Sequence, residues 1–261
     1  MFEIFASADA WIALLTLTFL EIVLGIDNII FISIAAGKLS GKAKAKAINI
    51  GLLLAMVNRI ILLFGISVLT SLKTAWFHID WGWISGGVSG QAIILFLGGL
   101  FLLYKSTREI HEKIEDKGHQ EAALEKKQST SFSSVLWQII VIDLVFSVDS
   151  ILTAIGMTNG ISPNPKDALM LMVIAVVVSV GIMMLFARAV GDFVGKHPTI
   201  QVLALSFLIL IGFMLITEAA HLSHVVVFGQ SIGAIPKGYL YFAIAFSLGV
   251  EFINMKLRPK K

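Results

Sequence analysis

The 261-residue sequence contains no cysteine and few charged residues. Without cysteine, the protein can form neither disulfides nor thiolate metal sites. Only 14% of its residues are charged, whereas soluble domains have roughly a quarter. Hydrophobic residues make up 57% of the chain, and the mean hydropathy is +0.90. A soluble fold of this size could hardly bury so much apolar surface, so the composition favours a polytopic membrane protein.

Seven segments are long and apolar enough to form spanning helices, each of which needs roughly 20 residues. They are about Ala10–Ile34, Ile48–Thr70, Gln91–Thr107, Val135–Met157, Ala168–Val190, Ile200–His221 and Lys237–Met255. The first segment lacks a preceding basic region and is too long for a signal peptide, so we expect it to be retained. The sequence therefore predicts an all-α membrane protein with seven transmembrane helices in a single domain, residues 1–261.

The lysine and arginine residues are divided unequally between the two sides that these spans define. Sixteen lie on the side of the C-terminus, whereas Lys73, Lys166 and Lys237 lie on the other side and Arg59 lies within the second span. Basic residues favour the cytoplasmic side of a membrane. We therefore expect the N-terminus outside and the C-terminus in the cytoplasm. This distribution explains the net charge of +3 without nucleic acid as a partner.

Two similar acidic segments lie in the first and fourth predicted spans. "EIVLGIDNII" (residues 21–30) and "DLVFSVDSIL" (residues 143–152) share an acid, five residues, Asp, and then Asn or Ser. A weaker match aligns Gly99 in the third span with Gly212 in the sixth. Because three spans are an odd number, the second copy must enter the membrane inverted. We predict repeats over about 10–107 and 135–222, a partly helical cytoplasmic linker over about 108–134, and an extra helix over about 237–255.

Carboxylates are costly inside a bilayer. A charge at the membrane centre costs about 2.5–3.5 kcal/mol, so these acids require a partner, a proton or a bound cation. The candidate ligands are Glu21, Asp27, Asn28, Asp143, Asp149 and Ser150. In each segment the first acid and the Asn or Ser lie seven residues apart and therefore on the same helix face. The Asp between them would join this face only if the helix unwound locally, which Gly25 favours in the first segment. Such oxygen ligands suit Mg²⁺, Ca²⁺ or Mn²⁺.

Other roles for the polar residues stay open at this stage. The acids could pair with Arg59, although one arginine cannot neutralise four carboxylates. They could also relay protons, and this role is compatible with metal binding. Glu218 and His221 belong to an E-x-x-H-x-x-H pattern that we interpret as interfacial in preference to an outer metal or proton site. Glu251 would support the inner mouth. Trp76, Trp81 and Trp83 are typical of an interfacial aromatic belt on the outer side.

Three segments resemble the TerC family of integral membrane proteins. They are "LEIVLGIDNIIFIS" (residues 20–33), "DLVFSVDSILTAIG" (143–156) and "YFAIAFSLGVEFINM" (241–255). The resemblance covers nearly the whole chain, and the N-terminus is similar to that of short bacterial members. It implies membership of a lysine-exporter-like superfamily and a role in the efflux of divalent metal, chiefly manganese. It also implies that the acids of the two motifs and their Asn and Ser neighbours form the site.

The leading hypothesis is an exporter of Mn²⁺ or a similar cation in a bacterial inner membrane. The metal would be the transported substrate, with no permanent cofactor, and export could be coupled to protons. The alternative is a non-transporting scaffold or accessory subunit in a stress-response or protein-insertion complex, in which the acids serve assembly. Besides metal and lipid, a second copy or another membrane protein is a possible partner. An enzyme is not expected, because no nucleophile and base are suitably arranged.

Overall fold

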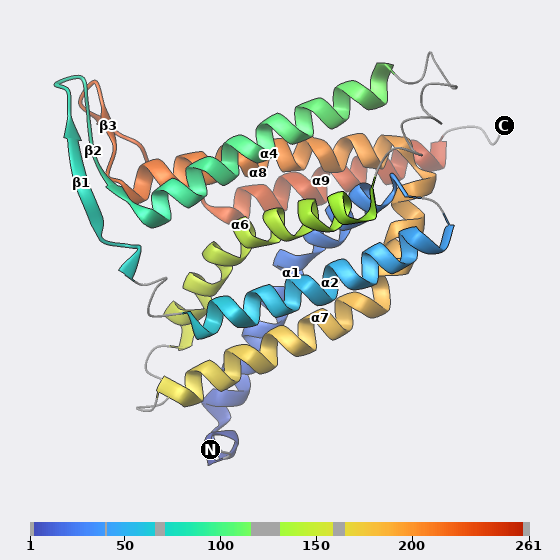
Figure 1. Cartoon of the computed structure of the whole chain (residues 1–261), viewed down its shortest axis with the longest axis horizontal. Helices are drawn as coiled ribbons and strands as arrows, with labels where there is room; N and C mark the ends of the chain where they lie inside the picture. The colour runs from blue at the N-terminus through green and yellow to red at the C-terminus, as the bar shows by residue number, and fades with distance from the viewer. Residues whose placement is uncertain (1–2, 40, 66–70, 116–130, 159–164, 258–261) are drawn as a thin grey trace. The chain divides into compact units, whose positions relative to one another are not determined.

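The protein is described by a computed structural model that covers residues 3–39, 41–65, 71–115, 131–158 and 165–257. After a short 3-10 helix, η1 (Glu3–Ala6), its long helices are α1 (Ala8–Ala36), α2 (Gly41–Phe64), α4 (Gly90–Glu115), α6 (Phe132–Thr158), α7 (Pro165–Lys196), α8 (Pro198–Leu222) and α9 (Lys237–Leu257) (Figure 1). Six of the seven are long and apolar enough to cross a membrane, and α6 contains a shorter apolar helix, Phe132–Val148. The prediction of a mostly helical polytopic membrane protein is confirmed.

Several helices, α2 and α4 among them, continue beyond their predicted spans into charged sequence. α2 begins at Gly41, before the predicted Ile48, and α4 continues to Glu115, beyond the predicted Thr107. The extension of α4 is supported by ion pairs one turn apart, of which Lys105 Nζ to Glu109 Oε1 is 2.8 Å long. Hydropathy detects only the apolar part of a helix, so it underestimates such helices. α2 ends at Phe64; the end predicted at Thr70 and residues 116–130 of the predicted linker lie outside the described residues.

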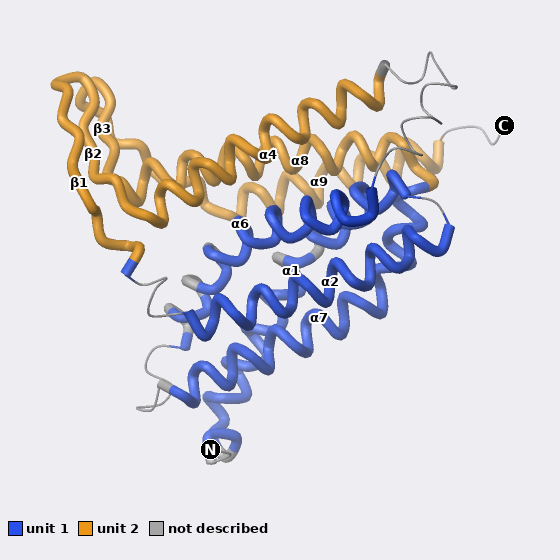
Figure 2. The backbone as a smooth tube through the Cα atoms, viewed as in Figure 1, with its two compact units in different colours: residues 1–71, 124–195 blue, residues 72–123, 196–261 orange. Residues whose placement is uncertain are grey.

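The chain divides into two compact units (Figure 2). Unit 1 comprises residues 1–71 and 124–195, with α1, α2, α6 and α7. Unit 2 comprises residues 72–123 and 196–261, with α4, α8 and α9. Unit 1 therefore contains the first two helices of each predicted repeat, and unit 2 contains the third helix of each together with α9. The two repeats and their inversion stay predictions.

Within unit 2, α4 and α8 approach closely at two glycines. A Cβ atom on Gly99 would lie 2.6 Å from the carbonyl oxygen of Gly212, and one on Gly212 would lie 2.9 Å from the carbonyl oxygen of Gly99. Glycines allow this close backbone packing between membrane helices. These are the two residues that the repeat alignment pairs. The repeat itself stays a prediction.

A small antiparallel sheet in unit 2 was not anticipated by the sequence analysis. Its strands, in spatial order, are β1 (Ala75–Asp80), β2 (Ile84–Ser89), β3 (Val226–Val227) and β4 (Gln230–Ser231). The β1–β2 turn contains Gly82 at φ 77°, whose N–H donates to Asp80 Oδ1 at 3.1 Å. The three tryptophans of the predicted aromatic belt lie on this hairpin and are all exposed. Their location at the interface stays a prediction.

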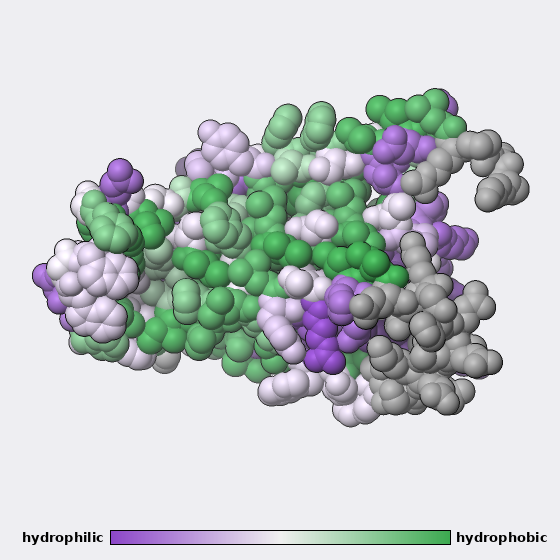
Figure 3. Space-filling model, turned by 90° about the horizontal axis from the view of Figure 1, so that it is seen from above, coloured by the Kyte–Doolittle hydropathy of each residue, from purple (hydrophilic) through white to green (hydrophobic). Residues whose placement is uncertain are grey.

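The outer surface of the helices is largely apolar. Figure 3 shows one face, on which hydrophobic side chains cover the middle and hydrophilic ones gather towards the ends. Large exposed apolar side chains occur in both units, including Leu185 on α7 and Phe242 on α9. In water such surfaces would mark a binding site or promote aggregation, whereas lipid solvates them without penalty.

Candidate carboxylate site

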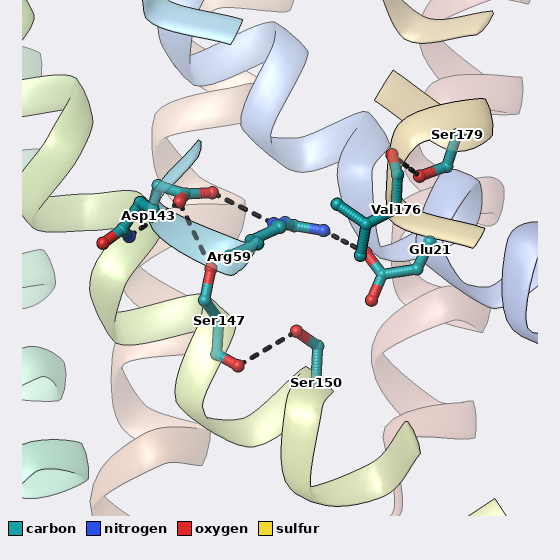
Figure 4. Close-up of polar contacts among 8 residues, drawn as sticks. Glu21, Arg59, Asp143, Ser147, Ser150, Val176 and Ser179 are labelled. Carbon is teal, nitrogen blue, oxygen red and sulfur yellow. Dashed lines mark hydrogen bonds and ion pairs between the residues drawn. The ribbon is translucent and has the colours of Figure 1, made fainter. Parts of the chain in front are cut away.

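Glu21 and Asp143 meet at the guanidinium group of Arg59 in the interior of unit 1 (Figure 4). Arg59 lies on α2 and donates through Nη1 to Glu21 Oε2, on α1, and through Nε to Asp143 Oδ1, on α6, at 3.3 Å. All three residues are buried, with 5% or less of their surface exposed. Acids from two helices that are distant in the sequence therefore converge on one buried point.

Asp143 has further hydrogen-bond partners. Asn58 Nδ2 donates to Oδ2 at 3.1 Å, and the Ser147 hydroxyl donates to the same oxygen at 3.2 Å. Together with Arg59, three donors thus compensate this carboxylate for the loss of water. The sequence analysis missed Asn58 and Ser147. Their positions carried a signal, because Asn58 precedes Arg59 in an apolar segment and Ser147 follows Asp143 by one helical turn.

The formal charges of this cluster do not cancel. With both carboxylates ionised, Glu21, Asp143 and Arg59 together carry −1. The structure thus shows the pairing with Arg59 that the sequence left open, and shows it for two acids at once. One guanidinium group bridges both acids but leaves one negative charge in excess, which favours a further cation or proton.

The remaining candidate ligands differ in their surroundings. Asn28 is 5% exposed, and its Oδ1 has no hydrogen-bond donor among the described residues. Ser150 is also buried, and its hydroxyl donates to the Ser147 carbonyl at 3.2 Å. The side chains of Asp27 and Asp149 lie outside the described residues. An orphan carbonyl oxygen in a spanning helix is unusual, because buried polar atoms are nearly always paired.

The helices that carry the two motifs are continuous. α1 runs through Gly25 and α6 runs through Asp149 without interruption. The local unwinding considered for these segments is therefore absent from this structure. A Cβ on Gly25 would lie 2.3 Å from Sδ of Met183 on α7, so the glycine provides space for a neighbouring side chain and leaves the helix intact.

The accessory candidates lie in unit 2, apart from Arg59. Glu218 and the exposed His221 are on α8, which ends at Leu222, and His224 beyond it has a left-handed backbone with φ 48°. The E-x-x-H-x-x-H residues therefore do not share one helix flank. Glu251 on α9 has a buried Oε1 atom without a partner in the described part of the chain. Among the described residues, no three His, Asp or Glu side chains are arranged to hold a metal ion.

Comparison with known proteins places this arrangement in a family. The family described as "Integral membrane protein TerC family" matches residues 6–259. The chain belongs to the TerC family. TerC proteins are integral membrane proteins and not a known enzyme family.

Relatives of this TerC protein match it along its length. The UPF0053 inner membrane protein YgdQ of Escherichia coli K12 is 44% identical over 261 residues, which cover 100% of this chain and 98% of YgdQ. A UPF0053 protein of Haemophilus influenzae is 43% identical over 258 residues, covering 99% and 98% of the two chains. The E. coli inner membrane protein YoaE is 41% identical over 256 residues, but only 45% of its length is covered. No solved structure matches the chain significantly. This TerC protein is a bacterial inner membrane protein.

Proposed function

We propose that this TerC protein exports a divalent metal ion, with Mn²⁺ as the substrate, through a carboxylate site between α1 and α6. The supporting observation is the convergence of Glu21 and Asp143 at one buried point between the long helices α1, α2 and α6. Two such acids are costly in a membrane, and intramembrane ionisable residues commonly mark ion pathways. Stability alone does not require them, because apolar residues of similar volume often replace buried ion pairs without loss of stability.

The donor atoms support a hard cation. The described candidates are two carboxylates, the orphan Oδ1 of Asn28 and the hydroxyl of Ser150. Such oxygen sets suit Mn²⁺, Mg²⁺ and Ca²⁺, and the choice of manganese rests on the resemblance to TerC proteins. Asn28 follows Glu21 by seven residues, so it lies about 10.5 Å further along α1 on nearly the same face. We propose that Asn28 marks a second station on the cation path, where Asp27 and Asp149 complete the predicted ligands.

The predicted topology orients the protein in the membrane, and export as the direction of transport rests on the resemblance to TerC proteins. The sixteen basic residues on one side favour a cytoplasmic C-terminus and an outer N-terminus. Alternating access would open the acids to one side of the membrane and then to the other. Export can be driven by proton exchange, because a carboxylate that releases metal can accept a proton.

Reconstitution tests this function. Purified protein in vesicles that contain a Mn²⁺-sensitive dye should move Mn²⁺, and a series with Mg²⁺, Ca²⁺ and Zn²⁺ at two pH values would define its selectivity and proton dependence. Glu21→Gln and Asp143→Asn should each lower the flux about tenfold or more, since each removes a charged ligand. The matched control is Asp192→Asn, because Asp192 is 61% exposed and its nearest ion-pair distance, to Lys44, is 3.9 Å. A wild-type protein that moves none of the metals would favour the non-transporting scaffold.

A further inference from the structure

We propose that Arg59 is a tethered competitor of the transported metal, a role that rests on the proposed function of the carboxylate site. In this view the guanidinium group occupies Glu21 and Asp143 when no metal is bound and leaves them when the metal arrives. Arg59 would then set the metal affinity, and it would stabilise the metal-free transporter while the protein returns to the state that binds the next ion. A purely structural arginine would hold the three helices together in every state.

The competition follows from which carboxylate oxygens are available. Oδ2 of Asp143 already accepts hydrogen bonds from Asn58 and Ser147. Its other oxygen, Oδ1, is the one that Arg59 binds, and Arg59 also binds Oε2 of Glu21. A metal ion that bridges the two acids through Oδ1 of Asp143 and Oε2 of Glu21 would compete with Arg59 for these oxygens. Because two cations repel each other at close range, such an ion would displace the guanidinium group.

The charges of the possible states permit such an exchange. The two acids and Arg59 together carry −1, and a divalent cation on the acids beside the displaced guanidinium group brings the total to +1, so each state is one charge from neutrality. With neither cation, two carboxylates would stand unpaired in a buried, low-dielectric site, which is strongly unfavourable. Arginine suits this task because its guanidinium group stays protonated and can bind two carboxylates at once. Arg59 is 2% exposed, so its guanidinium group neutralises the acids where little water reaches them.

The expected result of removing the competitor is tighter metal binding. We would measure Mn²⁺ binding calorimetrically on the purified full-length chain in lipid nanodiscs. Arg59→Ala should lower the Kd about tenfold or more and slow transport, because the empty carboxylates can no longer be neutralised. Methylguanidinium added to Arg59→Ala should weaken Mn²⁺ binding more than an equal concentration of sodium, whereas the wild type should respond equally to both salts. Arg188→Ala, at an exposed position on α7, is the matched control and should bind as the wild type does.

The possible outcomes separate this inference from the proposed function. If the wild type binds Mn²⁺ and Arg59→Ala binds it equally or more weakly, Arg59 is structural and the competitor role is wrong. If neither the wild type nor any variant binds Mn²⁺, the proposed function itself fails. If Arg59→Ala does not fold, Arg59→Lys provides the test. A lysine ammonium group lacks the planar set of N–H donors with which a guanidinium group binds two carboxylates at once. That variant should bind Mn²⁺ more tightly than the wild type, and equal or weaker binding would overturn the inference.

Discussion

The contact between Gly99 and Gly212 makes a quantitative prediction about the packing of α4 on α8. In Gly99→Ala, the new Cβ would lie 2.6 Å from the carbonyl oxygen of Gly212 and 2.7 Å from Cγ1 of Ile216. A backbone carbonyl cannot rotate away as a side chain can, so the two helices must separate. Overpacking of this kind costs about 1–3 kcal/mol, and we expect the upper half of that range. For a protein of this size, a loss of about 2–3 kcal/mol corresponds to a fall in Tm of about 4–12 °C.

The assay is thermal unfolding in detergent, followed by intrinsic fluorescence. Gly249→Ala is the control, because Gly249 lies within α9 of the same unit and a Cβ there meets no atom within 4 Å. Alanine favours helix over glycine by about 0.5–1 kcal/mol, so this variant should be as stable as the wild type or slightly more stable. If Gly99→Ala unfolds at the same temperature as Gly249→Ala, the close approach of α4 and α8 is wrong.

Two further predictions concern the glycine on α1 and the hairpin tryptophans. Gly25→Ala should cost less than Gly99→Ala, about 1 kcal/mol or less, because its Cβ would meet only the flexible end of Met183, which can adopt another rotamer. A loss as large as that of Gly99→Ala in the same melting assay would contradict this. Brominated lipids should quench the fluorescence of Trp81, which is 70% exposed, if the hairpin lies at the membrane interface. Quenching that is unchanged by Trp81→Phe would show that Trp81 does not reach the lipid.

The helices were predictable because a spanning segment must be apolar and must satisfy its own backbone hydrogen bonds. The same reasoning could not find the charged extension of α2 before Ile48, because it detects the membrane-buried part of a helix only. Nor did it find β1 and β2, whose aromatic residues fit both an exposed strand and an interfacial belt. The turn at Gly82 was the available signal, since Asp followed by a nearby Gly favours a tight turn.

The candidate site was predictable in its residues but not in its connections. The repeated pattern singled out Glu21 and Asp143 because acids are rare in spans. Arg59 could be named as a partner, but its contact with both acids depends on how α2 packs against α1 and α6. That packing is set by side chains throughout unit 1, and no local pattern encodes it. The donors from Asn58 and Ser147 depend on the same packing.

The shared arginine also bears on how the protein enters the membrane during synthesis. Arg59 follows Glu21 by 38 residues, and Asp143 follows Arg59 by a further 84. Glu21 on α1 and Arg59 on α2 carry opposite charges, so the two helices can insert together with these residues paired. Asp143 arrives later, on α6, and must be accommodated by a pair that is already formed. The order of translation thus spares the cell from inserting an isolated arginine, and Asp143, made later, gives the three-residue cluster its excess negative charge.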